Sequence, residues 1–191
     1  MAQITDLYIY PVKSLKGIAL KKVHTGLRGF KYDREWMITD SHYHFISQRE
    51  IESMATLKTG IDNASLILRS NTNQFSVSLH SEKLDQVRAT VWGDICDAYD
   101  EGDEVSNWLT EELGEYKGSS LRLVRFSADG ERVVPEEYLN GVKAQSAFSD
   151  QFPYLITSWE SLSKLNQVLN DKKSKEVSMN RFRPNIVVQG V

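Results

Sequence analysis

The stretch "ITDLYIYPVKSLKG", residues 4–17, carries the pattern that decides the fold. Apolar and polar residues alternate as far as Val12, which is typical of a β-strand, and "KSLKG" after it has the composition of a turn. The segment "GIALKKVHT", residues 17–25, follows at once and has the length of another strand. The N-terminus therefore predicts strands joined by a turn.

Further segments of strand length fill the rest of the first hundred residues. They are "EWMITD" (35–40), "HFISQ" (44–48), "ASLILRS" (64–70), "FSVSLH" (75–80), "RATVWG" (88–93) and "ICDAYD" (95–100). The connecting segments "GIDNAS", "SNTNQ" and "WGDI" contain the Gly, Asn and Asp that hairpin turns favour. This spacing predicts a barrel or a sandwich.

The period of the apolar residues changes after Gly102. In "DEVSNWLTEELG", residues 103–114, apolar residues recur at helical spacing behind acidic residues, and the segment ends at glycine. "SSLRLVRF" (119–126) returns to a strand pattern before a long polar stretch. "SWESLSKLNQVLND" (158–171) predicts a second amphipathic helix, with Ser158 as its N-cap.

The whole pattern predicts a mainly β fold with some α. Strands dominate before residue 100 and helices mix in after it, so the expected domains are residues 1–100 and 101–191. A chain of 191 residues is long enough to bury a sizeable core in this arrangement.

Composition limits the classes of partner. With 40% hydrophobic residues and a net charge of −3, the chain is globular and lacks the basic character of a general nucleic-acid binder. No apolar run approaches the roughly 20 residues that a membrane helix needs. We therefore expect a soluble, cytoplasmic protein with no nucleic-acid or membrane partner. The single cysteine, Cys96, fits a reducing compartment.

The usual catalytic and metal-binding signatures are absent. His42 and His44 in "HYH" would need a third metal ligand, and none is evident, so we expect a turn with both rings in solvent. Cys96 sits within an expected strand, where a packed thiol is the ordinary case. The chain has no Walker or Rossmann glycine loop and no nucleophile elbow. We assign no catalytic and no metal-ligating residue.

What remains is a set of cationic, hydroxyl and amide side chains at the ends of the expected elements. Arginine grips two phosphate oxygens with its planar fork, and a helix N-terminus presents free N–H groups beside hydroxyl donors. These residues therefore either share an anion pocket or lie singly in solvent, which is the commoner arrangement. They are Lys13, Ser14, Arg34, Thr157, Ser158, Arg181, Arg183 and Asn185.

At these residues the chain resembles a known family. "IYPVKSLKG", "YDREWMITD", "ISQREIESMA", "VWGD", "FSDQFPYLITSWESLSKLN" and "RFRPNIVVQG" occur in the order and approximate spacing of the MOSC family with its N-terminal β-barrel extension. That family includes the mitochondrial amidoxime-reducing component, the bacterial YcbX proteins and the C-terminal part of molybdenum cofactor sulfurases. The resemblance implies an N-terminal MOSC-type β-barrel over residues 1–100 and an incomplete MOSC barrel with flanking helices over 101–191.

The resemblance also implies a molybdopterin site. Lys13, Ser14 and Arg34 match positions that face the pterin and its phosphate in relatives. Thr157 and Ser158 match a hydroxyl pair at a helix start, Arg183 and Asn185 complete the pocket, and Arg181 is their neighbour. Asn185 is expected to order either the entry to the strand or the edge of the pterin.

The match departs from the family pattern at its end. In the family, the cysteine that ligates molybdenum lies tens of residues beyond the "RPN" segment, whereas this sequence ends at Val191. The expectation is either a truncated chain or a protein without metal chemistry, because Cys96 matches no family cysteine motif. An incomplete barrel would leave unpaired backbone groups along "NIVVQG", residues 185–190, open to self-association or a partner strand.

Three functions stay open from the sequence. The first is the N-terminal portion of a molybdenum-dependent oxidoreductase that reduces small N-hydroxylated substrates, with electrons from a reductase or a ferredoxin-like domain. The second is a non-catalytic carrier of molybdopterin or sulfur, akin to the sulfurases, whose pyridoxal-phosphate chemistry resides in another domain. The third is an inactive fragment.

Overall fold

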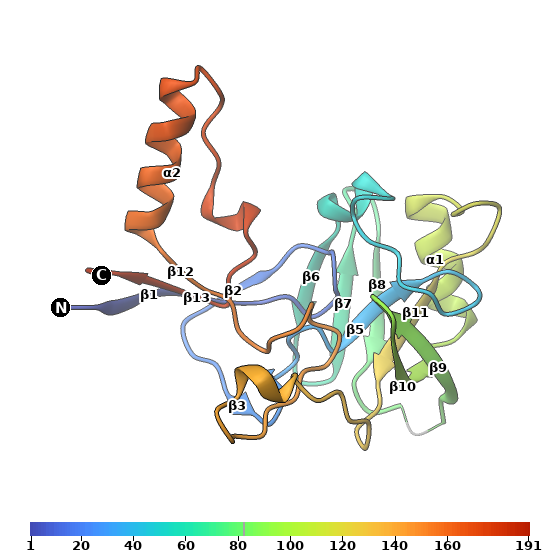
Figure 1. Ribbon diagram of the computed structural model, residues 1–191. Coiled ribbons are helices and arrows are strands. Elements are labelled where there is room, and N and C mark those ends of the chain that lie inside the picture. The colour runs from blue at the N-terminus through green and yellow to red at the C-terminus, as the bar shows by residue number, and fades with distance from the viewer. Residues whose placement is uncertain (82) are drawn as a thin grey trace.

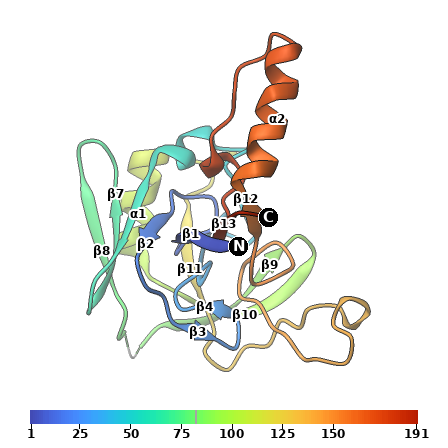
Figure 2. The ribbon, with the colours of Figure 1, turned by 90° about the vertical axis from the view of Figure 1, so that its left-hand side faces the viewer.

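The computed structural model describes residues 1–81 and 83–191 and is mainly β, with two α-helices and several single-turn 3-10 helices (Figures 1 and 2). The strands are β1 (Gln3–Ile9), β2 (Ile18–Leu20), β3 (Thr25–Gly26), β4 (Gly29–Phe30), β5 (Trp36–Thr39), β6 (Lys58–Ile61), β7 (Ser65–Arg69), β8 (Gln74–Ser78), β9 (Asp85–Val91), β10 (Asp94–Asp100), β11 (Arg122–Phe126), β12 (Ile156–Ser158) and β13 (Ile186–Gln189). The helices are α1 (Asp103–Leu113), α2 (Trp159–Asp171), η1 (Glu52–Thr56), η2 (Glu136–Tyr138) and η3 (Met179–Arg181).

The first and last strands of the chain are neighbours in one sheet, ordered β12-β13-β1-β2. β1 pairs antiparallel with both β2 and β13, and Gln3 lies opposite Gln189, so the two termini lie close together (Figure 1). β12 pairs with the other side of β13 in parallel. The expectation of unpaired backbone groups along "NIVVQG" is therefore wrong, because β13 has a partner strand on each side.

Two antiparallel sheets make up most of the remaining structure. One has the order β5-β11-β10-β9 and the other is the meander β6-β7-β8. Asp62 shapes the turn between β6 and β7 by accepting hydrogen bonds from the backbone N–H groups of Ala64 and Ser65. None of the sheets formed by residues 1–81 and 83–191 closes into a barrel, so the barrel shape expected from the sequence is not reached.

Alternation along β5 explains how the main core is built. Trp36 and Ile38 enter one buried cluster, together with α1 residues such as Val105 and Leu109, whereas Met37 between them enters a second cluster with Phe148. Successive side chains of a strand point to opposite faces, so β5 is covered on both sides. The first cluster joins residues from both sides of position 100, and the domain boundary there stays a prediction.

Helix α2 stands away from the sheets, as both views show (Figures 1 and 2). Ser158 caps it, since its Oγ accepts a hydrogen bond from the Ser161 N–H, as predicted. Only Leu162 of its apolar stripe is buried, in a small cluster with Met179 and Val187, while Leu165 and Val168 are exposed. The helix was predicted correctly, but half of its apolar stripe, Leu165 and Val168, is exposed.

Most of the strands predicted from alternation or strand length are present. The exception is "HFISQ", residues 44–48, in which His44 and Phe45 form only isolated bridges to Thr90 and Thr39. Strand β6 was not predicted, because its lysine and glycine do not form an apolar pattern. No helix formed by the described residues is long and apolar enough to span a lipid bilayer.

Candidate anion-binding site

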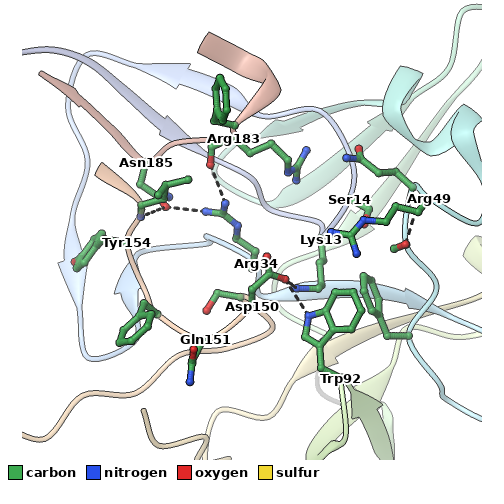
Figure 3. A pocket seen from close by; sticks show the side chains of 17 residues that line it. Lys13, Ser14, Arg34, Arg49, Trp92, Asp150, Gln151, Tyr154, Arg183 and Asn185 are labelled. Carbon is green, nitrogen blue, oxygen red and sulfur yellow. Dashed lines mark hydrogen bonds and ion pairs between the residues drawn. The ribbon is translucent and has the colours of Figure 1, made fainter. Parts of the chain in front are cut away.

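Segments far apart in the sequence meet around a cavity of about 390 Å³, shown in Figure 3. We call it the Lys13 pocket. Five of the residues predicted from the sequence line it, and it also draws on the loop after β5, the turn between β9 and β10, and the segment that precedes β12. The predicted residues are Lys13, Ser14, Arg34, Arg183 and Asn185.

Backbone conformations that L-residues rarely adopt concentrate at this pocket. The φ angles of Ser14, Arg34, Trp92 and Arg183 are 72°, 50°, 58° and 56°. Such angles are least expected for a bulky residue such as Trp92, or for Arg183, which directly precedes Pro184. Each costs free energy that the surrounding structure must offset, and such costs cluster at functional sites.

Lys13 is the most buried cation of the pocket. Its side chain is 7% exposed, and its Nζ lies 2.6 Å from Oδ1 of Asp150 and over the rings of Phe45 and Trp92. The indole N–H of Trp92 donates to the same carboxylate oxygen at 2.9 Å (Figure 3). Burial lowers the pKa of Lys13 to about 8, although the neighbouring Asp150 acts to raise it.

Arg34 connects the N-terminal and C-terminal segments. Its guanidinium pairs with the buried carboxylate of Asp33 and donates to Asn185 Oδ1 at 2.9 Å and to the Arg183 carbonyl at 3.0 Å. It also lies over the Tyr10 ring, 4.5 Å from the ring centre. Most of its donors are therefore used within the protein, so Arg34 positions the other pocket residues as well as adding charge.

Arg183 keeps more of its guanidinium for a ligand. One Nη1 hydrogen bond to the Leu15 carbonyl, at 2.6 Å, anchors it, and its guanidinium lies 4.3 Å from the centre of the Tyr10 ring. Burial, together with the nearby charge of Arg34, lowers the pKa of Arg183 to about 10. Two guanidinium groups on one tyrosine ring repel each other, and a bound anion would relieve that repulsion.

Asn185 is committed to the backbone. It is 1% exposed, and its Oδ1 accepts from the Leu155 N–H as well as from Arg34, while its Nδ2 donates to the Tyr8 carbonyl. These contacts fasten the start of β13 to β1 and to the segment before β12. Of the two roles expected for Asn185, the structure supports the ordering of the strand entry.

Three of the predicted residues do not line the Lys13 pocket. The Thr157 hydroxyl donates to the sulfur of Met179 at 3.2 Å, and Ser158 caps α2. Arg181, in η3, lines a different cavity that adjoins this one. The resemblance placed all three in the cofactor pocket, but Thr157 and Ser158 lie at the base of α2 instead.

Sequence reasoning missed Arg49, Trp92 and Asp150, which also line the pocket. Each lies inside a motif that carries the family resemblance, namely "ISQREIESMA", "VWGD" or "FSDQFPY", and this was the available signal. Asp150 is held in place by the buried Arg132, which donates to the carbonyls of Ser149 and Asp150 at 2.6 and 2.9 Å.

The donors fit a phosphate and a polar planar group, which are the organic end of a pterin cofactor. Lys13 and Arg183 supply positive charge, Ser14 supplies a hydroxyl, and Trp92 an aromatic face. No group of three His, Cys, Asp or Glu side chains suited to a metal occurs within residues 1–81 and 83–191. Cys96 is packed in a core cluster, where burial raises the pKa of its thiol, and His42 and His44 are exposed.

These features define a mainly β protein with a strained, cationic pocket for an anionic ligand, and comparison with known proteins gives its family. The chain belongs to the MOSC family. The family model described as the MOSC N-terminal beta barrel domain matches residues 1–116, and that of the MOSC domain matches residues 143–191.

The similar proteins fall into two groups. Mitochondrial amidoxime reducing component 2 of Bos taurus is 32% identical over 98% of this chain and 56% of its own length. Molybdenum cofactor sulfurase of Homo sapiens is 26% identical over 98% of this chain and 22% of its own length. The chain thus spans about half the length of the first and about a fifth of the second. The name of the second associates the family with the molybdenum cofactor.

Proposed function

We propose that this chain binds the molybdenum cofactor by holding the phosphate and pterin in the Lys13 pocket. The observation that carries the proposal is the convergence of Lys13, Arg34 and Arg183 on one cavity with strained backbone at Ser14, Arg34 and Arg183. A phosphate group carries up to two negative charges shared among its oxygens, and buried lysine and arginine donors form strong charge-assisted hydrogen bonds with them.

The pocket residues would have two roles, contact with the ligand and positioning of the residues that contact it. Lys13, Ser14 and Arg183 would contact the ligand, since each lines the pocket and retains donor capacity. Arg34 and Asn185 would position them through the hydrogen bonds that join the two ends of the chain. The aromatic rings of Phe45 and Trp92 would exclude water from one side of the ligand.

Reduction of N-hydroxylated compounds is the activity we propose for the whole protein. When bound, the cofactor supplies oxygen-atom transfer chemistry, with electrons from a reductase or a ferredoxin-like partner. The residues of this chain would orient the cofactor and screen it from solvent. Relatives named for amidoxime reduction, which align with 98% of this chain, support this activity.

A non-catalytic carrier of molybdopterin or sulfur is the second candidate. The observation that favours it is the donor set of the Lys13 pocket, which among the described residues suits the organic part of the cofactor and includes no cysteine or histidine. Similarity to molybdenum cofactor sulfurases is consistent with such a role.

The test is to purify the chain from a host that makes the cofactor, and to measure both molybdenum and the fluorescence of oxidised pterin. We expect pterin to co-purify and Arg183→Gln or Lys13→Gln to reduce it strongly, whereas Lys164→Gln on the exposed face of α2 leaves it unchanged. Absence of pterin from the unaltered protein would overturn the proposal. Turnover of an N-hydroxylated compound with an electron donor would then separate the reductase from the carrier.

A further inference from the structure

A second cavity, of about 870 Å³, adjoins the Lys13 pocket and shares Gln48, Arg49 and Arg183 with it. We call it the Arg181 cavity. Its own lining includes Lys16, Gly17 and Arg181, with Tyr8 and Tyr10 from β1 and the segment after it. The proposed function gives these residues no part.

The charge of this lining is strongly one-sided. Lys16, Arg49, Arg181 and Arg183 are cationic and Glu52 is the single acid, although the chain as a whole carries a net charge of −3. Four positive groups around one space raise the local potential and attract anions. The lining of this cavity is therefore positive although the chain as a whole is negative.

Within the described part of the chain, three of these cations make no hydrogen bond or ion pair through their charged groups, although the guanidinium of Arg49 lies over the Trp92 ring, 5.7 Å from its centre. In residues 1–81 and 83–191, no hydrogen bond or ion pair involves the charged group of Lys16, Arg49 or Arg181. Arginines elsewhere behave differently, since Arg122 and Arg125 each pair with a carboxylate. A solvated lysine or arginine is ordinary by itself, but three such groups that line one cavity keep their N–H donors available to a ligand there.

Two details of the cavity floor give it shape. Gly17 lies against Tyr10, and a Cβ at position 17 would be 2.4 Å from the tyrosine ring, so glycine lets the backbone pass. The buried Tyr10 hydroxyl has no hydrogen-bond partner among the described groups, and burial raises its pKa to about 12, which keeps it protonated. Tyr10 also carries the guanidinium of Arg183, at 4.3 Å, and thereby fixes one of the four cations.

We propose that the Arg181 cavity binds the phosphate or diphosphate group of a small molecule, independently of Lys13. Arg181 and Lys16 would hold the group from the outer side, and Arg49 and Arg183 from the boundary with the Lys13 pocket. A phosphate group suits this lining better than a single carboxylate, because it carries more charge and offers several oxygens to arginine forks. The group belongs either to a separate molecule or to an outward extension of the ligand in the Lys13 pocket.

The test is calorimetric titration of the cofactor-free protein with inorganic diphosphate. The double variant Lys16→Gln/Arg181→Gln is expected to bind it about tenfold more weakly or worse, because two charge-assisted contacts are lost. Both side chains are exposed, so the variant should fold normally. The double variant Lys164→Gln/Lys175→Gln removes the same charge from α2 and the segment after it, and it should bind like the unaltered protein.

The remaining outcomes are equally specific. Lys13→Gln should leave this binding in place, which separates failure of the Arg181 cavity from failure of the Lys13 pocket. Equal weakening in the Lys164→Gln/Lys175→Gln control, or no effect of Lys16→Gln/Arg181→Gln, overturns the proposal. The same titration is then made on protein that already holds the cofactor. If diphosphate still binds, the Arg181 cavity serves a separate molecule. If diphosphate binds only to the cofactor-free protein, the cavity holds an outward extension of the ligand in the Lys13 pocket.

Discussion

Lys13 and Asp150 form an ion pair of unequal partners, in which Nζ lies 2.6 Å from Oδ1 while the two side chains are 7% and 81% exposed. The ammonium of Lys13 is buried, whereas the carboxylate of Asp150 reaches it from the surface. An anionic ligand that approaches Lys13 must therefore compete with Asp150, which can turn to solvent at little cost because its side chain is already largely in water.

The substitution Asp150→Asn should strengthen anion binding. It removes the competing charge but keeps an oxygen that can accept the Trp92 hydrogen bond. We expect roughly tenfold tighter binding of inorganic phosphate, measured by calorimetry, which corresponds to about 1.4 kcal/mol. Asp103→Asn is the matched control, since Asp103 is an exposed carboxylate paired with Arg122. Weaker phosphate binding in Asp150→Asn would mean that Asp150 holds Lys13 in place for the ligand.

Anion binding should also weaken as the pH rises through about 8. Burial lowers the pKa of Lys13 to about 8, so the ammonium loses its proton near that pH and with it the charge that attracts the ligand. Sulfate is a suitable probe, because its own charge does not change in this range. The dependence should disappear in Lys13→Gln, and an unchanged pH profile in that variant would assign the titration to another group.

The lowered pKa of Lys13 also predicts how the stability of the fold changes with pH. An unfolded lysine has a pKa of about 10.4, so between about pH 8 and 10.4 the unfolded chain binds more protons than the folded one. The contribution of Lys13 to the free energy of unfolding must therefore increase with pH in that window. Comparing urea denaturation of the protein and of Lys13→Met at several pH values isolates this contribution, and a decrease would contradict the buried position of Lys13.

Removal of Arg34 should destabilise the fold. Arg34→Met leaves the buried carboxylate of Asp33 without a cation and removes one of the two hydrogen bonds to Asn185 Oδ1. Breaking a buried pair on one side costs about 3–5 kcal/mol, whereas losing an exposed pair costs about 0–1 kcal/mol. Arg88→Met, which breaks an exposed pair with Asp97, is the control. Urea denaturation measures both, and equal losses would mean that Arg34 does not join the two ends of the chain.

Local structure was well predicted from the sequence, because it depends on neighbouring residues. A short run of strand length identified β5, and the 3.6-residue period identified α1 and α2. Alternation does not say which strands pair, so the contact of β1 with β13 and the failure of the sheets to close were not predicted. The period also did not indicate that Leu165 and Val168 in the apolar stripe of α2 would be exposed.

The site was only partly predicted, because the sequence does not show which distant residues come into contact. Residue type and family motif brought Lys13, Arg34 and Arg183 to attention, and these residues do meet. Asp150 was missed because an acid is not expected in an anion pocket, and its role depends on a long-range contact with Lys13. Arg181 was assigned with Arg183, but only Arg183 reaches the Lys13 pocket, whereas both line the Arg181 cavity.

Two roles are open for Ser158: the structure makes it the N-cap of α2, and the family resemblance implies a contact with the cofactor. Its Oγ accepts the Ser161 N–H at 3.1 Å and donates to the Ser161 hydroxyl at 3.0 Å, so its hydrogen-bonding capacity is used at the start of α2. Ser158→Ala should therefore lower the free energy of unfolding by about 1 kcal/mol, the usual cost of a lost N-cap, and leave pterin content unchanged. Ser163→Ala, on the exposed face of the same helix, should preserve or slightly raise stability, because alanine is the better helix former. Loss of pterin from Ser158→Ala at unchanged stability would instead show that the hydroxyl serves the cofactor, as the resemblance implies.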